Sequence, residues 1–187
     1  MEERDDSYYI ARVLDGRPDA FAPLVDRYKT MAYNISLGIV KRPEDAEEIT
    51  QDSFVKAYRS LRGFKGDARF STWLFRIVYN TSVSHLRKKK REIVSDLSDN
   101  QLIHEGINEE GGSGNEELMA AALKNALELL PGEERTMISL YYYQDSSVVE
   151  IAEIMDMSVS NIKVRLFRTR KKLYEHIKGV MKNEIYL

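Results

Sequence analysis

Apolar residues recur at three- and four-residue steps through most of the first 90 positions, the period that places side chains on one face of an α-helix. A short helix is predicted over residues 6–15, with Asp6 or Ser7 as its cap and Gly16 as its stop. A second helix is predicted from about Asp19, and Pro23 fits its first turn, where a missing N–H costs little. The apolar stripe of this second helix is Phe21, Leu24, Val25, Tyr28, Met31, Ala32, Ile35 and Ile39.

Two further helices are predicted before residue 92. One opens at Pro43 and ends near Gly63, with an inward stripe of Ala46, Ile49, Ser53, Ala57 and Leu61 and a polar face of Asp45, Glu48, Gln51 and Asp52. A polar face of this kind is often only solvated, so the sequence leaves its role open. After a loop over 65–69, another helix is capped by Ser71 or Thr72 and turns inward Trp73, Leu74, Ile77, Val78 and Thr81.

The apolar pattern stops between residues 92 and 117. This stretch has no basic residue, few large apolar ones, and the cluster Gly-Gly-Ser-Gly at 111–114. Such a composition cannot bury enough surface to offset the entropy lost on ordering. We therefore predict a flexible acidic linker over 92–115 that joins two small helical domains, residues 1–91 and 116–187, in an all-α protein.

The second domain shows a short helix, a tight turn and a longer helix. Helical patterns over about 118–130 and 132–144 come first, divided by Pro131-Gly132. Val148, Ile151, Ala152 and Met155 then mark a short helix, which Asp156-Met157 separates from a longer one capped by Ser158 or Ser160. This order predicts a helix-turn-helix, and the alternative is a helical hairpin with a basic outer face.

Charge is strongly segregated along the chain, although the formal net charge is only −2. Residues 59–91 carry ten basic and one acidic residue, residues 92–117 carry eight acidic and no basic residues, and residues 161–187 carry eight basic and two acidic residues. Two basic blocks separated by an acidic one are typical of a protein with two nucleic-acid contacts.

The first basic block, Phe64–Arg91, alternates aromatic residues with cations and ends in five consecutive positive charges. Cations bind phosphates through counterion release, and flat aromatic side chains stack on unpaired bases. Phe70 and Trp73 can equally be core aromatics. The block is therefore predicted to bind nucleic acid, with a share of its aromatic residues in the core.

In the second basic block, the later helix of a helix-turn-helix enters the major groove of duplex DNA. With Ile162, Leu166 and Leu173 packing inward, the DNA face is predicted to consist of Ser160, Asn161, Lys163, Val164, Arg165, Phe167 and Arg168. Arg and Lys suit guanine edges, and Val or Phe can touch a thymine methyl group. The phosphate backbone is left to Arg170, Lys171 and Lys172.

Several function classes find no support in the residues. The sequence has no phosphate-cradling Gly-rich loop, no nucleophile elbow and no ordered set of metal ligands, so we expect no enzyme activity, no cofactor and no metal. The absence of Cys agrees with a reducing compartment. No apolar run is long enough to cross a bilayer, and the first residues do not look like a secretion signal. We expect a cytoplasmic protein without membrane insertion.

Four blocks together resemble bacterial RNA polymerase sigma factors of the extracytoplasmic-function group within the sigma-70 family. The blocks are DAFAPLVDRY at 19–28, DAEEITQDSFVKAY at 45–58, FSTWLFRIVYN at 70–80, and EIAEIMDMSVSNIKVRLFRTRKKL at 150–173. They cover nearly the whole chain outside the acidic stretch, in the order and spacing of the family.

The resemblance implies roles for particular residues. It implies that Asp45, Glu48, Gln51 and Asp52 bind core RNA polymerase and that the helix-turn-helix reads an upstream promoter element as duplex. It also implies that the first basic block holds the melted downstream element, through Phe64, Lys65, Arg69, Phe70, Trp73, Arg76, Asn80, Arg87, Lys88, Lys89, Lys90 and Arg91. A further implied partner is an anti-sigma factor, often membrane-tethered, that covers these surfaces.

Two features depart from the family pattern. Val164 replaces the small polar residue that is frequent there, which removes a hydrogen-bonding group and can change sequence preference. The stretch 92–117 is strongly acidic, and we hypothesise that it occupies a basic polymerase channel as a mimic of RNA. Two other functions stay open on the residues alone: a helix-turn-helix regulator of duplex DNA that is not a polymerase subunit, and a helical interaction protein that binds no DNA.

Overall fold

A computed structural model describes residues 5–95 and 115–184, and within these ranges all regular structure is helical. The predicted all-α fold is confirmed. The first half contains α1 (Asp6–Leu14), α2 (Ala22–Val40), α3 (Pro43–Ser60) and α4 (Phe70–Ser95), with short 3₁₀ turns at Pro18–Phe21 and Leu61–Gly63. The second half contains α5 (Asn115–Glu128), α6 (Gly132–Tyr143), α7 (Val148–Met155) and α8 (Val159–Glu184).

Helix boundaries differ from the predicted ones at several places, and α2 begins at Ala22, after a 3₁₀ turn, where a start at about Asp19 is predicted. Asp5, rather than Asp6 or Ser7, caps α1, because its carboxylate accepts the Asp6 N–H. Helix α4 already begins at Phe70, and the Trp73 N–H donates to the Arg69 carbonyl at 3.1 Å. The same helix continues through Ser95, past the predicted start of the linker. The rest of the predicted linker, 96–114, lies outside the described residues.

The core of the first half lies where α2, α3 and α4 pack together. The inward stripe predicted for α3 is buried in full, and Leu74 and Val78 of α4 are completely buried. Buried hydroxyl groups among these helices are hydrogen-bonded: Ser82 donates to the Val78 carbonyl at 2.8 Å, and Thr50 donates to the Ala46 carbonyl at 2.7 Å. The packing leaves one side of α4 free of α2 and α3.

The predicted helix-turn-helix is present as α7 and α8. Helix α7 begins with a capping box in which Ser147 and Glu150 each accept the other's backbone N–H. Asp156 makes the turn in the left-handed region at a φ of 53°, a conformation that Asp tolerates better than most residues. Ser158 caps α8, since its hydroxyl oxygen accepts the Asn161 N–H at 3.2 Å. Ile162 and Leu166 are buried as predicted.

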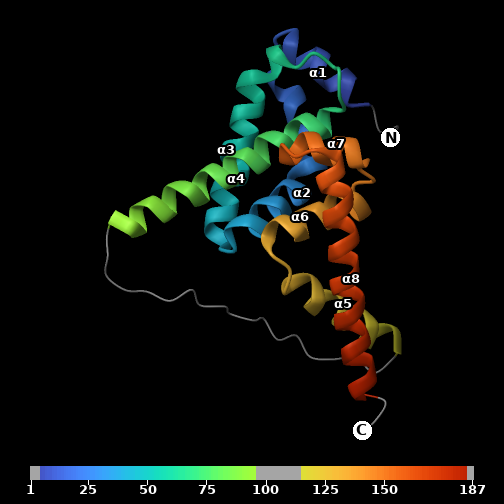
Figure 1. Ribbon diagram of the computed structural model, residues 1–187. Helices are drawn as coiled ribbons and strands as arrows, with labels where there is room; N and C mark the ends of the chain where they lie inside the picture. The colour runs from blue at the N-terminus through green and yellow to red at the C-terminus, as the bar shows by residue number, and fades with distance from the viewer. Residues whose placement is uncertain (1–4, 96–114, 185–187) are drawn as a thin grey trace.

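The two halves pack directly against each other, with α7 on α4 and α6 on α2 (Figure 1). The backbones of α2 and α6 meet at a pair of glycines, because a Cβ added to Gly132 would lie 2.0 Å from the Gly38 carbonyl oxygen. The far end of α4 and the far end of α8 both extend away from this contact (Figure 1). Among the described residues, no helix is long and apolar enough to span a bilayer.

Candidate nucleic-acid interfaces

An aromatic cluster forms the start of α4 and the loop before it. The ring of Phe64 lies 5.3 Å from Trp73 and 5.8 Å from Phe70, and the rings of Phe70 and Trp73 are 5.7 Å apart. Phe70 is only 3% exposed, whereas Phe64 and Trp73 are half-buried. Phe70 therefore belongs to the core, and the edge of the cluster that reaches solvent consists of Phe64 and Trp73.

Polar residues of α4 continue this edge along the helix. Trp73 and Asn80 are seven residues apart, which places them on one face, and Asn80 is exposed. Lys65, Arg69 and Arg76 are also exposed. Four basic residues at the far end of α4 are exposed as well: Arg87, Lys88, Lys90 and Arg91. A strand of nucleic acid laid along α4 would meet an aromatic face first and a cationic stretch afterwards.

Lys89 lies apart from the other cations because it is paired with Asp45 of α3. Its ammonium donates to Asp45 Oδ2 at 2.7 Å, and His85 Nε2 lies 3.9 Å from the same oxygen. Burial opposes ionisation of Asp45, but the hydrogen bond and charge of Lys89, with Arg42 and His85, outweigh it and lower the pKa of Asp45. Of the four residues predicted to meet polymerase, Asp45 is thus engaged within the chain, and Glu48, Gln51 and Asp52 are exposed.

The side of α4 that is free of α2 and α3 is covered by the second half of the chain. Thr72 and Tyr79 are buried there, although neither was part of the predicted stripe. Burial and the nearby charge of Glu133 raise the pKa of Tyr79. No local sequence signal reveals this second buried face, because the helices that cover it lie more than 50 residues away in the chain.

Acidic residues of α7 reach the predicted DNA residues of α4. Glu150 Oε1 lies 3.4 Å from Arg69 Nε and accepts a hydrogen bond from the Thr72 hydroxyl at 3.3 Å. Glu153 Oε1 lies 3.9 Å from Arg76 Nη1. Burial opposes ionisation of Glu150, but its hydrogen bonds with Ser147 and the charge of Arg69 outweigh it and lower the pKa of Glu150. No pattern in the sequence predicts a role for either acid.

The outer face of α8 presents most of its predicted DNA residues to solvent. Phe167 is 70% exposed and Val164 is 44% exposed. The exposed polar members of the predicted set are Ser160, Asn161, Lys163, Arg168 and Lys171. Apolar and cationic side chains side by side on one exposed helix suit a DNA groove.

Three cations of α8 are engaged with α6. Arg165 lies 2.7 Å from Glu133, and Lys172 donates to Glu134 at 2.8 Å. The Arg170 guanidinium stacks over the Tyr141 ring at 4.8 Å. In this arrangement Arg165, which is predicted to contact DNA, is paired with a carboxylate of α6. Arg170 and Lys172 contact α6 as well, although both are predicted to bind phosphates.

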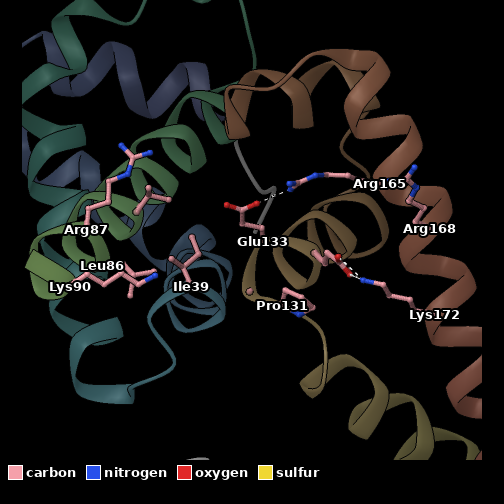
Figure 2. A pocket seen from close by; sticks show the side chains of 12 residues that line it. Ile39, Leu86, Arg87, Lys90, Pro131, Glu133, Arg165, Arg168 and Lys172 are labelled. Atoms are coloured by element: carbon pink, nitrogen blue, oxygen red, sulfur yellow. Dashed lines mark hydrogen bonds and ion pairs between the residues drawn. The ribbon is translucent and has the colours of Figure 1, made fainter. Parts of the chain in front are cut away.

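The two basic helices face each other across a cleft of about 720 Å³ (Figure 2). Arg87 and Lys90 of α4 line one wall, and Arg165, Arg168 and Lys172 of α8 line the other. Ile39 and Leu86 contribute apolar surface on the α4 side (Figure 2). Within residues 5–95 and 115–184, no His, Asp or Glu cluster of a kind that could hold a metal ion is present.

Comparison with known proteins places both halves in one family. The Sigma-70 region 2 family matches residues 24–92, and the Sigma-70, region 4 family matches residues 120–173. The ECF RNA polymerase sigma factor SigW of Bacillus subtilis is 32% identical over 91% of this chain and 96% of its own length. The ECF RNA polymerase sigma-E factor of Haemophilus influenzae is 31% identical over 96% of this chain and 99% of its own length.

Solved structures show a similar fold. One is the sigma factor RpoE of Bartonella quintana in complex with the anti-sigma factor NepR. It is 25% identical to this chain, with a TM-score of 0.66 over 84% of this chain and 96% of its own. The other is CnrH in complex with the cytosolic domain of CnrY. It is 23% identical, with a TM-score of 0.63 over 93% of this chain and 97% of its own.

Proposed function

The chain belongs to the extracytoplasmic-function sigma factors of RNA polymerase, and from this premise we propose how its two basic surfaces divide the work of recognising a promoter. A sigma factor binds core polymerase and directs it to specific promoters for the initiation of transcription. The match extends over both halves, so a regulator that acts on duplex DNA without polymerase is not supported. We assign residues 1–95 to the region 2-like domain and 115–187 to the region 4-like domain, so the linker predicted over 92–115 is shortened to 96–114, because α4 continues through Ser95 and α5 begins at Asn115.

The α4 surface is proposed to hold the melted strand of the downstream element. Its outer edge combines the half-buried ring of Trp73 with the exposed amide of Asn80 on one helix face. A base that leaves the stack can lie against the ring, and an amide can hydrogen-bond with the edge of that base. The exposed cations at the end of α4 then neutralise the phosphates on either side.

The α8 surface is proposed to read the upstream element as intact duplex. Lys163 and Arg168 are exposed at positions where side chains meet base edges, and Val164 and Phe167 can contact thymine methyl groups. Lys171 serves the phosphate backbone. Val164 cannot donate a hydrogen bond to a base edge, but it can contact a thymine methyl group. This chain is therefore expected to prefer an A·T pair at the position that Val164 meets, where a polar residue would accept other base pairs as well.

The exposed face of α3 is proposed to bind core polymerase through Glu48, Gln51 and Asp52. Asp45 supports this face indirectly, because its bond with Lys89 fixes α3 against the far part of α4. The helix proposed to bind polymerase and the helix proposed to hold the strand are thereby linked by an ion pair as well as by core packing.

One observation carries the assignment most strongly: a partly exposed aromatic cluster lies at the start of the helix that ends in a run of cations, which a reader of duplex alone does not need. Run-off transcription with core polymerase on a pool of genomic fragments tests it directly. We expect specific transcripts that depend on added chain. DNA binding by the chain without chain-dependent transcripts would contradict the assignment.

We also propose an anti-sigma factor as a partner, a cytoplasmic location, and action without catalysis by the chain itself. The RpoE structure of similar fold is a complex with an anti-sigma factor. We expect a tagged form of the chain to capture a further partner from the source cells, the anti-sigma factor, besides the polymerase subunits. Mass spectrometry of the captured proteins identifies it. Recovery of polymerase subunits alone would argue against it.

A further inference from the structure

Helix α1 is joined to α2 through the carboxylate of its first residue, Asp6. The cap of α1 is supplied by Asp5, whose side chain accepts the Asp6 N–H at 2.7 Å. Both carboxylate oxygens of Asp6 therefore serve α2: Oδ1 accepts from the Arg27 guanidinium, and Oδ2 accepts from the Tyr28 hydroxyl at 2.5 Å. The Asp6 side chain is only 17% exposed, so water competes little for these two bonds.

Tyr28 connects this carboxylate to the aromatic residues of α4. The centroid of its ring lies 5.8 Å from that of Phe70 and 5.8 Å from that of Phe75, and both phenylalanines are buried. Burial and the hydrogen bond to Asp6 raise the pKa of Tyr28, so its hydroxyl stays protonated and donates at physiological pH. Tyr28 is thus held by α1 at its hydroxyl and by α4 at its ring.

The position of Phe70 in turn determines where the two solvent-reaching rings lie. Phe64 meets Phe70 edge to face at an interplanar angle of 86°, and Trp73 is tilted against Phe70 by 40°. Side chains in a close-packed core transmit displacement to their neighbours, because few voids are available to absorb it. A series of direct contacts therefore runs from Asp6 through Tyr28 and Phe70 to the exposed edge of the cluster.

Helix α1 also contacts the segment that leads into Phe64. It lies against the 3₁₀ turn Leu61–Gly63, and the Phe64 N–H donates to the Leu61 carbonyl at 3.0 Å. Ile10 of α1 is buried in the same core cluster as Leu61. The helix therefore supports the aromatic edge at two points, although it lies outside the segment that is proposed to hold the strand.

We propose that Asp6 and Tyr28 are positioning residues for recognition of the melted strand. Their hydrogen bond fixes the ring of Phe70, on which Phe64 and Trp73 rest, in the geometry that lets an unpaired base stack. Recognition needs this support, because a binding surface is precise only when its side chains are held by a further layer of contacts. The inference rests on the proposed function of the α4 surface. It adds that α1, to which that function assigns no DNA contact, contributes to promoter opening.

Tyr28→Phe tests the proposal, because it removes the hydroxyl and keeps the ring that packs on α4. Trp73 is the only tryptophan of the chain, so its fluorescence reports on the aromatic cluster. We expect acrylamide to quench Trp73 more strongly in the folded Tyr28→Phe chain than in wild type. Opening by the corresponding holoenzyme, measured with 2-aminopurine in the downstream element of a template selected by run-off transcription, is expected to fall about threefold or more. Duplex affinity is expected to stay within about twofold of wild type, since the duplex contacts are remote.

Asp6→Ala removes the acceptor in place of the donor, and Asp26→Ala is its matched control. Asp26 also lies on α2 next to Arg27, but its side chain is 71% exposed and pairs with Lys29 at the surface. Asp6→Ala is expected to reduce opening at least as much as Tyr28→Phe, and Asp26→Ala is expected to leave it unchanged. Adding Tyr28→Phe to the Asp6→Ala chain is expected to have no further effect, because the bond is already absent. Losses that add in full would overturn the proposal.

Duplex affinity distinguishes positioning from a general loss of stability. Equal losses of opening and duplex affinity in Tyr28→Phe would overturn the proposal, as would unchanged opening or unchanged quenching of Trp73. Asn80→Ala separates this inference from the proposed function, because Asn80 is exposed on the strand-binding face. If holoenzyme with Asn80→Ala opens the promoter as wild type does, the role of α4 fails. If it loses opening while Tyr28→Phe and Asp6→Ala retain it, the positioning role alone fails.

Discussion

The two proposed DNA-binding helices, α4 and α8, are of equal length but use their aromatic residues in opposite ways. At the start of α4, Phe70 is buried and Trp73 is half-buried, so the aromatic surface there is the solvent-exposed edge of the core. On α8, Phe167 stands in solvent and packs against no part of the core. Residues of α4 therefore serve stability and recognition together, while residues of the α8 outer face can serve recognition alone.

The largest expected contrast is between two phenylalanines. Phe70→Ala is expected to lower the free energy of unfolding by about 3–5 kcal/mol, the usual cost of removing a buried ring. Phe167→Ala is expected to change it by no more than about 0.5 kcal/mol, because the side chain is exposed. Urea denaturation of both variants measures the difference. Similar values for the two would show that α4 and α8 do not differ in this way.

The second contrast concerns the duplex. Lys163→Ala and Arg168→Ala are each expected to weaken binding of holoenzyme to duplex promoter DNA by about 1–3 kcal/mol if the side chain meets a base. Arg76 lies on α4, the helix proposed to hold the melted strand, so Arg76→Ala is expected to leave duplex binding nearly unchanged. Filter binding at fixed salt compares the three variants. A loss from Arg76→Ala as large as those from the α8 variants would assign α4 to duplex as well.

A third prediction concerns pH and the anchoring of α4. The pKa of Asp45 is lowered in the folded chain, so its bond with Lys89 stabilises the fold above the unfolded pKa of about 3.9 and is lost as pH falls below it. Wild type is expected to be more stable than Asp45→Asn at pH 6 and to lose this advantage progressively as pH falls from the unfolded pKa through the lower pKa of Asp45 in the folded chain. Thermal unfolding across this range measures it. An advantage that is constant with pH would exclude the ion pair as the cause.

The smallest expected effects come from buried hydroxyl groups. Ser82 of α4 donates a hydrogen bond to Val78, so Ser82→Ala is expected to cost about 1 kcal/mol. Thr169 of α8 is buried, and its hydroxyl has no partner among the described residues. Thr169→Val, of nearly the same shape, is therefore expected to be neutral or slightly stabilising. A denaturant midpoint below that of wild type for Ser82→Ala, and a midpoint equal to or above it for Thr169→Val, would agree with this difference. A clearly lower midpoint for Thr169→Val would oppose it.

Prediction from the sequence succeeded where structure follows from local pattern. The periodic stripes identified the helices, and the sequence of short helix, tight turn and longer helix identified α7 and α8. It did not identify the second buried face of α4, because Thr72 and Tyr79 have polar groups and are covered by a distant part of the chain. No local pattern reveals that Asp45, which is predicted to bind polymerase, is paired with Lys89, 44 residues away. Contacts between remote segments leave no periodic signal in a single sequence.

The division of work between α4 and α8 is tested most directly by measuring promoter opening and duplex binding on the same holoenzymes. A template selected by run-off transcription, with 2-aminopurine in its downstream element, reports opening by fluorescence, and filter binding reports duplex affinity. We expect Asn80→Ala to reduce opening by tenfold or more with duplex affinity within twofold of wild type, and Lys163→Ala to reduce duplex affinity. Equal losses of opening and duplex affinity in Asn80→Ala would contradict the account.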